Sequence, residues 1–131
     1  MTPEVLSELA MLAMYGAYAP YSGYKVGAAL LCADGKVYTG CNIENASYTP
    51  TVCAERTAFF KAISDGKREF SAIAVCGGKD GRIEGFFPPC GVCRQVMREF
   101  CPQDFLIYLH DDQGGVVSYT LAQLLPQSFS L

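Results

Sequence analysis

Three cysteines and one glutamate stand in two short stretches of the chain, at a spacing that suits a metal site. Cys53 is followed two residues later by Glu55, and Cys90 and Cys93 form a Cys-x-x-Cys pair that begins 37 residues after Cys53. A zinc site with three protein ligands keeps one position open, which is typical of catalytic rather than structural zinc. A carboxylate beside that position can move the protons of an activated water. The pattern therefore predicts a zinc hydrolase centre.

A Cys-x-x-Cys pair alone is ambiguous between zinc binding and thiol redox chemistry. In a redox protein of the thioredoxin type the pair stands alone after a first strand, whereas here it follows the third predicted strand and has Cys53 upstream. This favours metal binding. A structural zinc site would need a fourth ligand, and the one histidine, His110, ends a late predicted strand. A lone histidine is more often a packed or solvated residue than a ligand.

Three thiolates on Zn²⁺ leave a net charge of about −1, which opposes the activation of water near neutral pH. Arg56 directly follows Glu55, while Arg94 and Gln95 directly follow Cys93. We expect Arg56, Arg94 and Gln95 to donate hydrogen bonds to the sulfurs, aided by two helix N-termini. An ordinary surface position is a stronger alternative for Arg94 than for Arg56.

The composition predicts a soluble globular protein with a single domain, residues 1–131. Half of the residues are hydrophobic, and no apolar run approaches the ~18 residues of a membrane span. The N-terminus lacks the features of a secretory signal and the seven cysteines are an odd number, so we expect a cytoplasmic protein with free thiols. A net charge of −3 argues against nucleic-acid binding and favours a small substrate.

Periodicity and turn signals predict four helices and five strands. The expected helices cover residues 2–17, 53–64, 90–100 and 120–125; the expected strands cover 25–33, 36–43, 70–76, 105–110 and 116–119, with a glycine-rich loop at 77–87. The apolar run 70–76 is typical of a central strand. The turn at 111–115 is too short for a crossover helix, so the last strand pair should be antiparallel. The expected fold is α/β, with a mixed five-stranded sheet between helices.

The helix at 53–64 imposes a condition on the site. Residues two apart on a helix point about 200° apart, so Cys53 and Glu55 can serve one site only if Cys53 stands at the helix cap. The helix dipole would also stabilise a thiolate there. Cys90 and Cys93 are about 60° apart around a helix axis, so both can reach one metal. Two helix N-termini should therefore converge on one ion.

Two irregular segments carry more aromatic and polar groups than a connection needs. In the segment 18–24, Tyr24 is the candidate for function, while its other tyrosines either line a pocket or pack over the sheet edge. In the segment 42–48, alternation places Asn42 and Glu44 on one side of the chain. An Asx-type turn with a solvated glutamate is the alternative, but the position just before Cys53 favours a role in the site.

Cys53-Ala-Glu55 followed by Pro89-Cys-Gly-Val-Cys93 resembles the signature of the zinc nucleoside and nucleobase deaminases. A cysteine as first ligand, rather than histidine, sets the chain apart from polynucleotide deaminases and guanine deaminase. The stretches 18–22, 26–31 and 40–46, and a Leu-Leu-Pro with a following Phe129, extend the likeness over nearly the whole length. Within the cytidine and deoxycytidylate deaminase superfamily, the chain looks like a small cytidine deaminase of the homotetrameric type.

The resemblance implies hydrolytic deamination of cytidine and 2′-deoxycytidine to the uridines in pyrimidine salvage, and a three-layer α/β/α fold. It implies one zinc per chain, held by Cys53, Cys90 and Cys93. Water would attack C4 of the base, and Glu55 would carry its proton to N3 and then assist the departure of ammonia. It also implies a homotetramer with shared active sites. The residues implied to contact substrate or a neighbouring site are Tyr24, Asn42, Glu44, Ala46, Tyr48, Ala54 and Phe129.

Within this set, Asn42 and Glu44 would bind the ribose 3′-hydroxyl, and Tyr24 would stack on the base where the family more often has Phe. Phe129 would reach a neighbouring subunit's site. Three other functions compete with this interpretation. A blasticidin-S type deaminase lacks the Asn-x-Glu pair, a zinc-stabilised binding module has no use for Glu55, and a dithiol redox protein holds no stoichiometric zinc.

Overall fold

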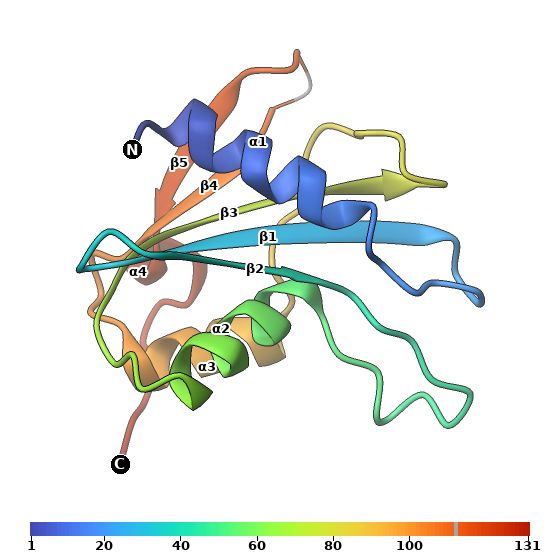
Figure 1. Cartoon of the computed structure of the whole chain (residues 1–131). Coiled ribbons are helices and arrows are strands. Elements are labelled where there is room, and N and C mark those ends of the chain that lie inside the picture. Colours follow the sequence, from blue (N-terminus) through green and yellow to red (C-terminus); the bar gives the residue numbers. More distant parts are fainter. Residues whose placement is uncertain (112) are drawn as a thin grey trace.

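The computed structural model describes residues 1–111 and 113–131, and Figure 1 shows their arrangement. The elements are α1 (Pro3–Met14), β1 (Tyr24–Cys32), β2 (Val37–Cys41), α2 (Ala54–Ser64), β3 (Phe70–Lys79), α3 (Gly91–Phe100), β4 (Leu106–His110), β5 (Val116–Thr120) and α4 (Leu121–Leu124). One five-stranded sheet has the order β2-β1-β3-β4-β5, so β3 is central as expected. Among the strand pairs that the described residues form, β3–β4 is parallel and the others are antiparallel, including the last pair, β4–β5, as predicted.

Helices cover both faces of this sheet, which gives the expected three layers (Figure 1). On one face, Leu6 and Ala10 of α1 pack against small residues of β1 and β3. On the other face, Phe59 of α2 and Met97 of α3 pack against the larger side chains of the same strands. Ser7 of α1 also shares a buried hydrogen bond of 2.8 Å with Nε2 of His110, so this histidine ties a helix to β4.

The first helix begins where the sequence predicts and ends three residues earlier. Thr2 is the N-cap, and its hydroxyl accepts a hydrogen bond from the amide of Val5. After Met14, the amides of Tyr15 and Gly16 bond three residues back instead of four, which tightens the chain and ends the α-helix. No helix in the described part of the chain is long and apolar enough to cross a membrane.

The loop expected at 77–87 begins too early, because β3 continues to Lys79. Gly77 and Gly78 pair with Val26 and Lys25 of β1. A Cβ on Gly77 would lie 2.7 Å from the carbonyl oxygen of Lys25. Gly77 therefore permits close approach of backbones within the sheet. The predicted turn at 111–115 includes residue 112, which lies outside the described residues.

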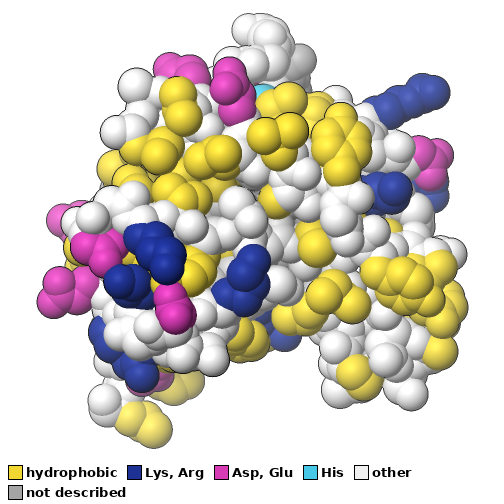
Figure 2. Space-filling view, viewed as in Figure 1, with side chains coloured by type: hydrophobic (Ala, Val, Ile, Leu, Met, Phe, Trp, Pro, Cys, Tyr) yellow, Lys and Arg dark blue, Asp and Glu magenta, His cyan; other side chains and the backbone are white. Residues whose placement is uncertain are grey.

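Large apolar side chains remain on the surface. Figure 2 shows hydrophobic side chains gathered over α1 and on the segment that projects between β2 and α2. Leu12 of α1 and Tyr48 of the projecting segment are among the exposed residues. Contiguous exposed apolar surface often marks an interaction site.

Gly40 of β2 allows α2 to lie close to the sheet, and this close approach can be tested. A Cβ at Gly40 would lie 2.5 Å from the carbonyl oxygen of Ala54 and 2.6 Å from the amide nitrogen of Ala58, both in the backbone of α2. We expect Gly40→Ala to lower the free energy of unfolding by about 1–3 kcal/mol, because the helix must move. Chemical denaturation measures this change.

The matched control is Gly16→Ala. Its added Cβ would meet its nearest neighbours at 3.5 and 3.6 Å, which is ordinary contact, so stability should change by only ~0.5 kcal/mol. Equal stability of the two variants would contradict a tight contact between β2 and α2.

Candidate active site

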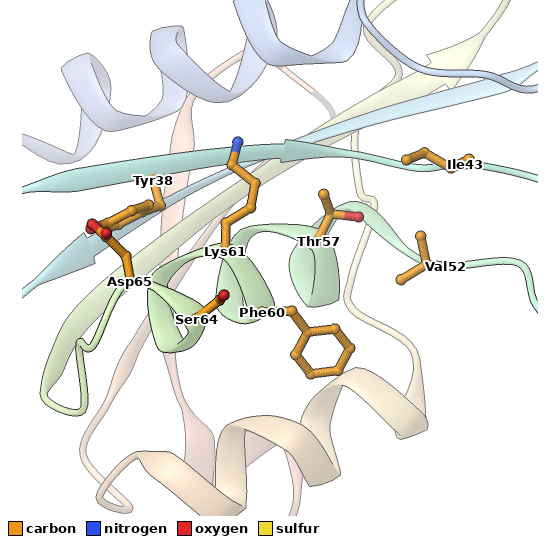
Figure 3. Close-up of a pocket in the computed structure, with 8 residues that line it drawn as sticks. All are labelled: Tyr38, Ile43, Val52, Thr57, Phe60, Lys61, Ser64 and Asp65. Carbon is orange, nitrogen blue, oxygen red and sulfur yellow. The ribbon is translucent and has the colours of Figure 1, made fainter.

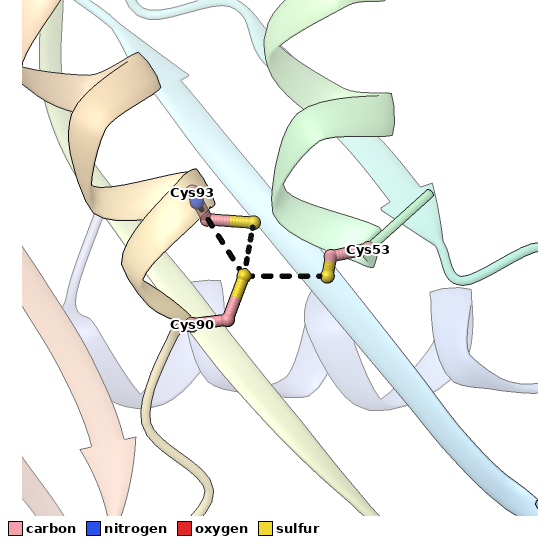
Figure 4. Close-up of side chains that lie close together, drawn as sticks. All are labelled: Cys53, Cys90 and Cys93. Carbon is pink, nitrogen blue, oxygen red and sulfur yellow. Dashed lines mark hydrogen bonds between the residues drawn. The ribbon is translucent and has the colours of Figure 1, made fainter. Parts of the chain in front are cut away.

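The three predicted cysteine ligands meet at the N-termini of two helices (Figure 4). Cys53 is the N-cap of α2 and Cys90 is the N-cap of α3, with Cys93 in the first turn of α3. Their sulfur atoms lie within 4.8 Å of one another, at 3.6 Å for Cys53 and Cys90 and 3.5 Å for Cys90 and Cys93. The expectation that Cys53 stands at the helix cap is confirmed.

Local backbone conformation explains why the sulfurs converge. Cys53 and Cys90 both have extended backbone angles, with φ near −75° and −68°, so each side chain leaves the helix axis before the first regular turn. The amide of Cys93 also approaches the sulfur of Cys90 at 3.5 Å. Free amide groups at a helix N-terminus stabilise negative charge, so both ends favour thiolates.

The thiol group fits zinc in distance and in charge. Tetrahedral coordination at about 2.3 Å places sulfurs roughly 3.8 Å apart, close to the separations seen here. Hydrogen bonds from the Cys93 thiol and from Arg56 lower the pKa of Cys53 to about 5. The contact with Cys53, together with burial, raises the pKa of Cys93, because a second negative charge beside the first is unfavourable. A divalent cation removes that conflict, so the three thiols form a site for one Zn²⁺ per chain.

Arg56 lies where the charge argument requires it. Its Nη2 donates to the sulfur of Cys53 at 3.4 Å, and its Nε is buried without a partner among the described residues. The guanidinium is therefore held against the thiol group. This geometry agrees with the expectation that Arg56 offsets the charge of the third thiolate.

Arg94 and Gln95 do not meet the same expectation. The guanidinium of Arg94 donates to the carbonyl of Pro89 at 2.7 Å and to that of Leu124 at 2.6 Å. Gln95 donates to the carbonyl of Phe129 at 3.2 Å. Residues one and two positions after Cys93 point about 100° and 200° away from it on the helix, which turns both side chains off the sulfurs. They fasten α4 and the C-terminal tail to α3 instead.

A pocket of about 130 Å³ opens beside the sulfurs. It is lined by Val26, Asn42, Cys53, Ala54, Glu55, Phe87, Pro88 and Cys90. Glu55 is only 4% exposed, and burial raises the pKa of its carboxyl to about 7. A group with such a pKa can both accept and release a proton near neutral pH. The structure thus places the predicted carboxylate and two of the thiols in one cavity.

Three lining residues, Val26, Phe87 and Pro88, were missed as site residues from sequence. Val26 belongs to a predicted strand and to the stretch 26–31 that carries the family likeness, and neither feature assigns it to a pocket. Phe87 and Pro88 directly precede the buried Pro89 and Cys90, so the signal for them was an apolar segment leading into a ligand. Side-chain direction in such a segment depends on the fold around it.

Asn42 and Glu44 lie in different surroundings. Asn42 lines the pocket, where its Oδ1 accepts from the amide of Val26 and its Nδ2 donates to the carbonyl of Tyr24, both at 2.8 Å. Glu44 accepts from the amides of Tyr21 and Ser22 and from the Ser22 hydroxyl, and the last bond holds its pKa below the usual value. Glu44 lines a separate pocket of about 410 Å³, so the structure brings only Asn42 to the Glu55 cavity.

The remaining predicted residues occupy the rim and the surface. Tyr24 is 42% exposed, and its ring centroid lies 6.2 Å from that of Phe87, which connects it to the pocket wall. Ala54 is fully buried in the pocket lining. Ala46, Tyr48 and Phe129 are exposed to solvent. None of these three is among the residues that line the cavity.

Loss of one sulfur should abolish zinc retention. Cys53→Ser replaces a soft thiolate by a hydroxyl, a much poorer ligand for zinc. We expect metal analysis of purified protein to fall from about one zinc per chain to a small fraction of that value. Cys41→Ser is the control, because Cys41 is a free thiol outside the sulfur cluster. Unchanged zinc content in the Cys53 variant would show that the cluster is not the metal site.

Comparison with known proteins agrees with this geometry. Residues 1–109 match the family model described as the cytidine and deoxycytidylate deaminase zinc-binding region. The chain is 51% identical to a cytidine deaminase of Halalkalibacterium halodurans, over 99% of this chain and 96% of the relative. It is 54% identical to one of Sporosarcina psychrophila, over 87% and 81%.

A solved structure extends the agreement from sequence to fold. The cytidine deaminase of Burkholderia pseudomallei superposes with a TM-score of 0.90 at 50% identity, covering 98% of this chain and all of that one. The chain belongs to the cytidine and deoxycytidylate deaminase family.

Proposed function

We propose that this chain catalyses the hydrolytic deamination of cytidine and 2′-deoxycytidine to uridine and 2′-deoxyuridine, with release of ammonia, in pyrimidine salvage. The observation that carries the proposal is the shared cavity, in which Glu55 lies beside the thiols of Cys53 and Cys90. Membership of the deaminase family supports it. All seven cysteines are free thiols, which supports a reducing compartment, the cytoplasm.

Groups of this chain offset the negative charge of the three thiolates. When bound, zinc supplies Lewis acidity that makes water a nucleophile near neutral pH. Cys53, Cys90 and Cys93 would hold the ion, and Arg56, which donates to the sulfur of Cys53, would draw negative charge from that sulfur. The N-termini of α2 and α3 act in the same direction.

Glu55 carries the protons of the reaction. Its carboxylate takes a proton from the attacking water and delivers it to N3 of the base as the new oxygen bond forms at C4. Glu55 then passes the proton of the new C4 hydroxyl to the amino group, the C4–N4 bond breaks, and ammonia leaves as the C4 carbonyl forms. The carboxyl can serve both steps because it is almost fully buried and faces the same cavity as the thiols.

Asn42 and Glu44 have unused hydrogen-bonding groups that can bind a ribose hydroxyl. Asn42 makes two hydrogen bonds to the backbone, one through Oδ1 and one through Nδ2. Its Nδ2 keeps one free N–H and its Oδ1 keeps one free lone pair. Glu44 accepts three bonds and retains further acceptor capacity. A 3′-hydroxyl that accepts from Asn42 and donates to Glu44 would bridge the two pockets. Tyr24 at the rim offers a face on which the base stacks.

The reaction predicts a defined substrate pattern and a defined effect of Glu55→Gln. The wild-type chain should deaminate cytidine and 2′-deoxycytidine, but neither free cytosine nor blasticidin S. Glu55→Gln removes the proton carrier and leaves every thiol in place, so activity should fall by about 10²–10⁴ or more while zinc content stays unchanged. Ultraviolet absorbance and released ammonia report turnover.

Glu69→Gln is the matched control, because Glu69 is an exposed glutamate outside the cavity, and it should retain wild-type activity. A zinc-loaded wild-type chain that leaves cytidine unchanged would overturn the proposed function. Near-normal turnover by Glu55→Gln would remove Glu55 from the mechanism.

We further propose that the chain works as a homotetramer whose active sites are shared. A groove of about 760 Å³, shown in Figure 3, is lined by Tyr38, Ile43, Val52, Thr57, Phe60, Lys61, Ser64 and Asp65. Ile43 and Phe60 are 45% and 48% exposed. Because Ile43 and Val52 adjoin Asn42 and Cys53 in sequence, a second copy seated here would lie beside the active site. Phe129 is exposed, and its carbonyl accepts a hydrogen bond from Gln95. This arrangement supports a role for Phe129 in the active site of a neighbouring subunit.

A charge placed in this groove should break the assembly. Phe60→Glu buries an unpaired carboxylate in the proposed contact, so light scattering should show a smaller species than the wild-type tetramer, with lower activity. Leu12→Glu is the control, because Leu12 is also exposed, at 68% against 48% for Phe60, but lies on α1, across the sheet. A fully active monomer would contradict shared sites.

A further inference from the structure

Phe87 is the largest side chain lining the pocket that contains Glu55. This pocket of about 130 Å³ is far smaller than the ~300–1,000 Å³ typical of sites for drug-sized ligands. It therefore takes a single ring rather than a whole nucleoside. Any substituent on that ring must fit against a wall that is already close.

The wall formed by Phe87 is held in place by its neighbours. The side chain is half-buried and packs against the hydrophobic core, and its ring lies 6.2 Å from that of Tyr24 at an interplanar angle of 38°. Pro88 and the buried Pro89 follow it. A residue before proline is confined to extended backbone, and each proline has a fixed φ. The prolines therefore restrict the backbone at Phe87, and its contacts with the core and with Tyr24 hold the ring as a wall of the pocket.

The proposed reaction orients the base against this wall. C4 must face the thiols and N3 must face Glu55, and N3 and C5 are the two ring neighbours of C4 on opposite sides. Figure 4 shows that Cys53 at the start of α2 and Cys90 at the start of α3 approach the site from opposite sides. Glu55 belongs to α2. With N3 on that side, C5 points toward the segment that leads into α3, which contains Phe87.

We infer that Phe87 determines specificity at carbon 5 of the base, excluding cytidines that carry a substituent there. The inference rests on the proposed function and adds a substrate limit to it. 5-Methylcytidine differs from cytidine by one methyl group at that carbon. A methyl or methylene group in an apolar pocket changes kcat/KM by about 10–200-fold, so the effect of this wall is measurable.

The experiment compares kcat/KM for 5-methylcytidine with kcat/KM for cytidine in the same preparation of enzyme. The ratio is independent of the active fraction, so partial loss of folding does not affect it. Phe87→Ala should raise the ratio about tenfold or more, and Phe87→Leu should raise it by less. Phe86→Ala is the control, because Phe86 is exposed, packs on Tyr119 at 5.9 Å and does not line the pocket. Its ratio should equal that of the wild type.

An unchanged ratio in the Phe87 variants, or an equal rise in Phe86→Ala, overturns the inference. If Phe87→Ala fails to fold, Phe87→Leu decides the question, with any rise above the control supporting the inference. The wild-type assay separates the two proposals. Turnover of cytidine with a ratio insensitive to Phe87 refutes the specificity role alone, whereas a wild-type chain that turns over neither substrate refutes the proposed function and this inference with it.

Discussion

Repulsion between closely spaced sulfurs is the constraint on which the site depends. Three thiols within 4.8 Å cannot all ionise unless positive charge stands near them. The chain supplies that charge from the N-termini of α2 and α3 and from Arg56, which contacts Cys53. These contributions ease the first deprotonation but leave Cys93 with a raised pKa. A divalent ion neutralises the remaining thiolate charge, so the geometry of the helix ends and the binding of the metal depend on each other.

Convergence of the two helix ends depends in turn on how the helices rest on the sheet. At Gly40 the backbone of β2 lies so close to α2 that a Cβ would collide with it. The start of α3 is held by a different device, in which Arg94 joins the carbonyls of Pro89 and Leu124. The first contact depends on the missing side chain of Gly40, and the second depends on the long side chain of Arg94. Both contacts restrict the position of a helix end that carries a ligating cysteine.

Features that depend on local geometry were predictable from the sequence. The position of Cys53 at a helix cap follows from a two-residue spacing and the angle per residue, and the antiparallel last strand pair follows from a short turn. Arg94 and Gln95 follow Cys93 in sequence but turn away from it around the helix, so they donate to backbone carbonyls rather than to the sulfurs. Glu44 was drawn away from the cavity by bonds to Ser22, a residue 22 positions earlier. Such partners are set by the tertiary fold, which strand alternation does not reveal.

Burial of the carboxyl and ionisation of the thiols make opposite demands on the same cavity. Low exposure raises the pKa of Glu55 to about 7, which suits a group that must both take and give a proton. Low exposure also disfavours thiolate charge, and at Cys93 it adds to the contact with Cys53 in raising the pKa of the thiol. A more hydrated pocket would favour ionisation of the thiols. It would also lower the pKa of Glu55 toward that of an ordinary carboxyl group, which is a poor proton donor near neutral pH. The two demands are met by where positive charge lies. Arg56 contacts the sulfur of Cys53, whereas the residues that line the pocket with Glu55 include no lysine, arginine or histidine.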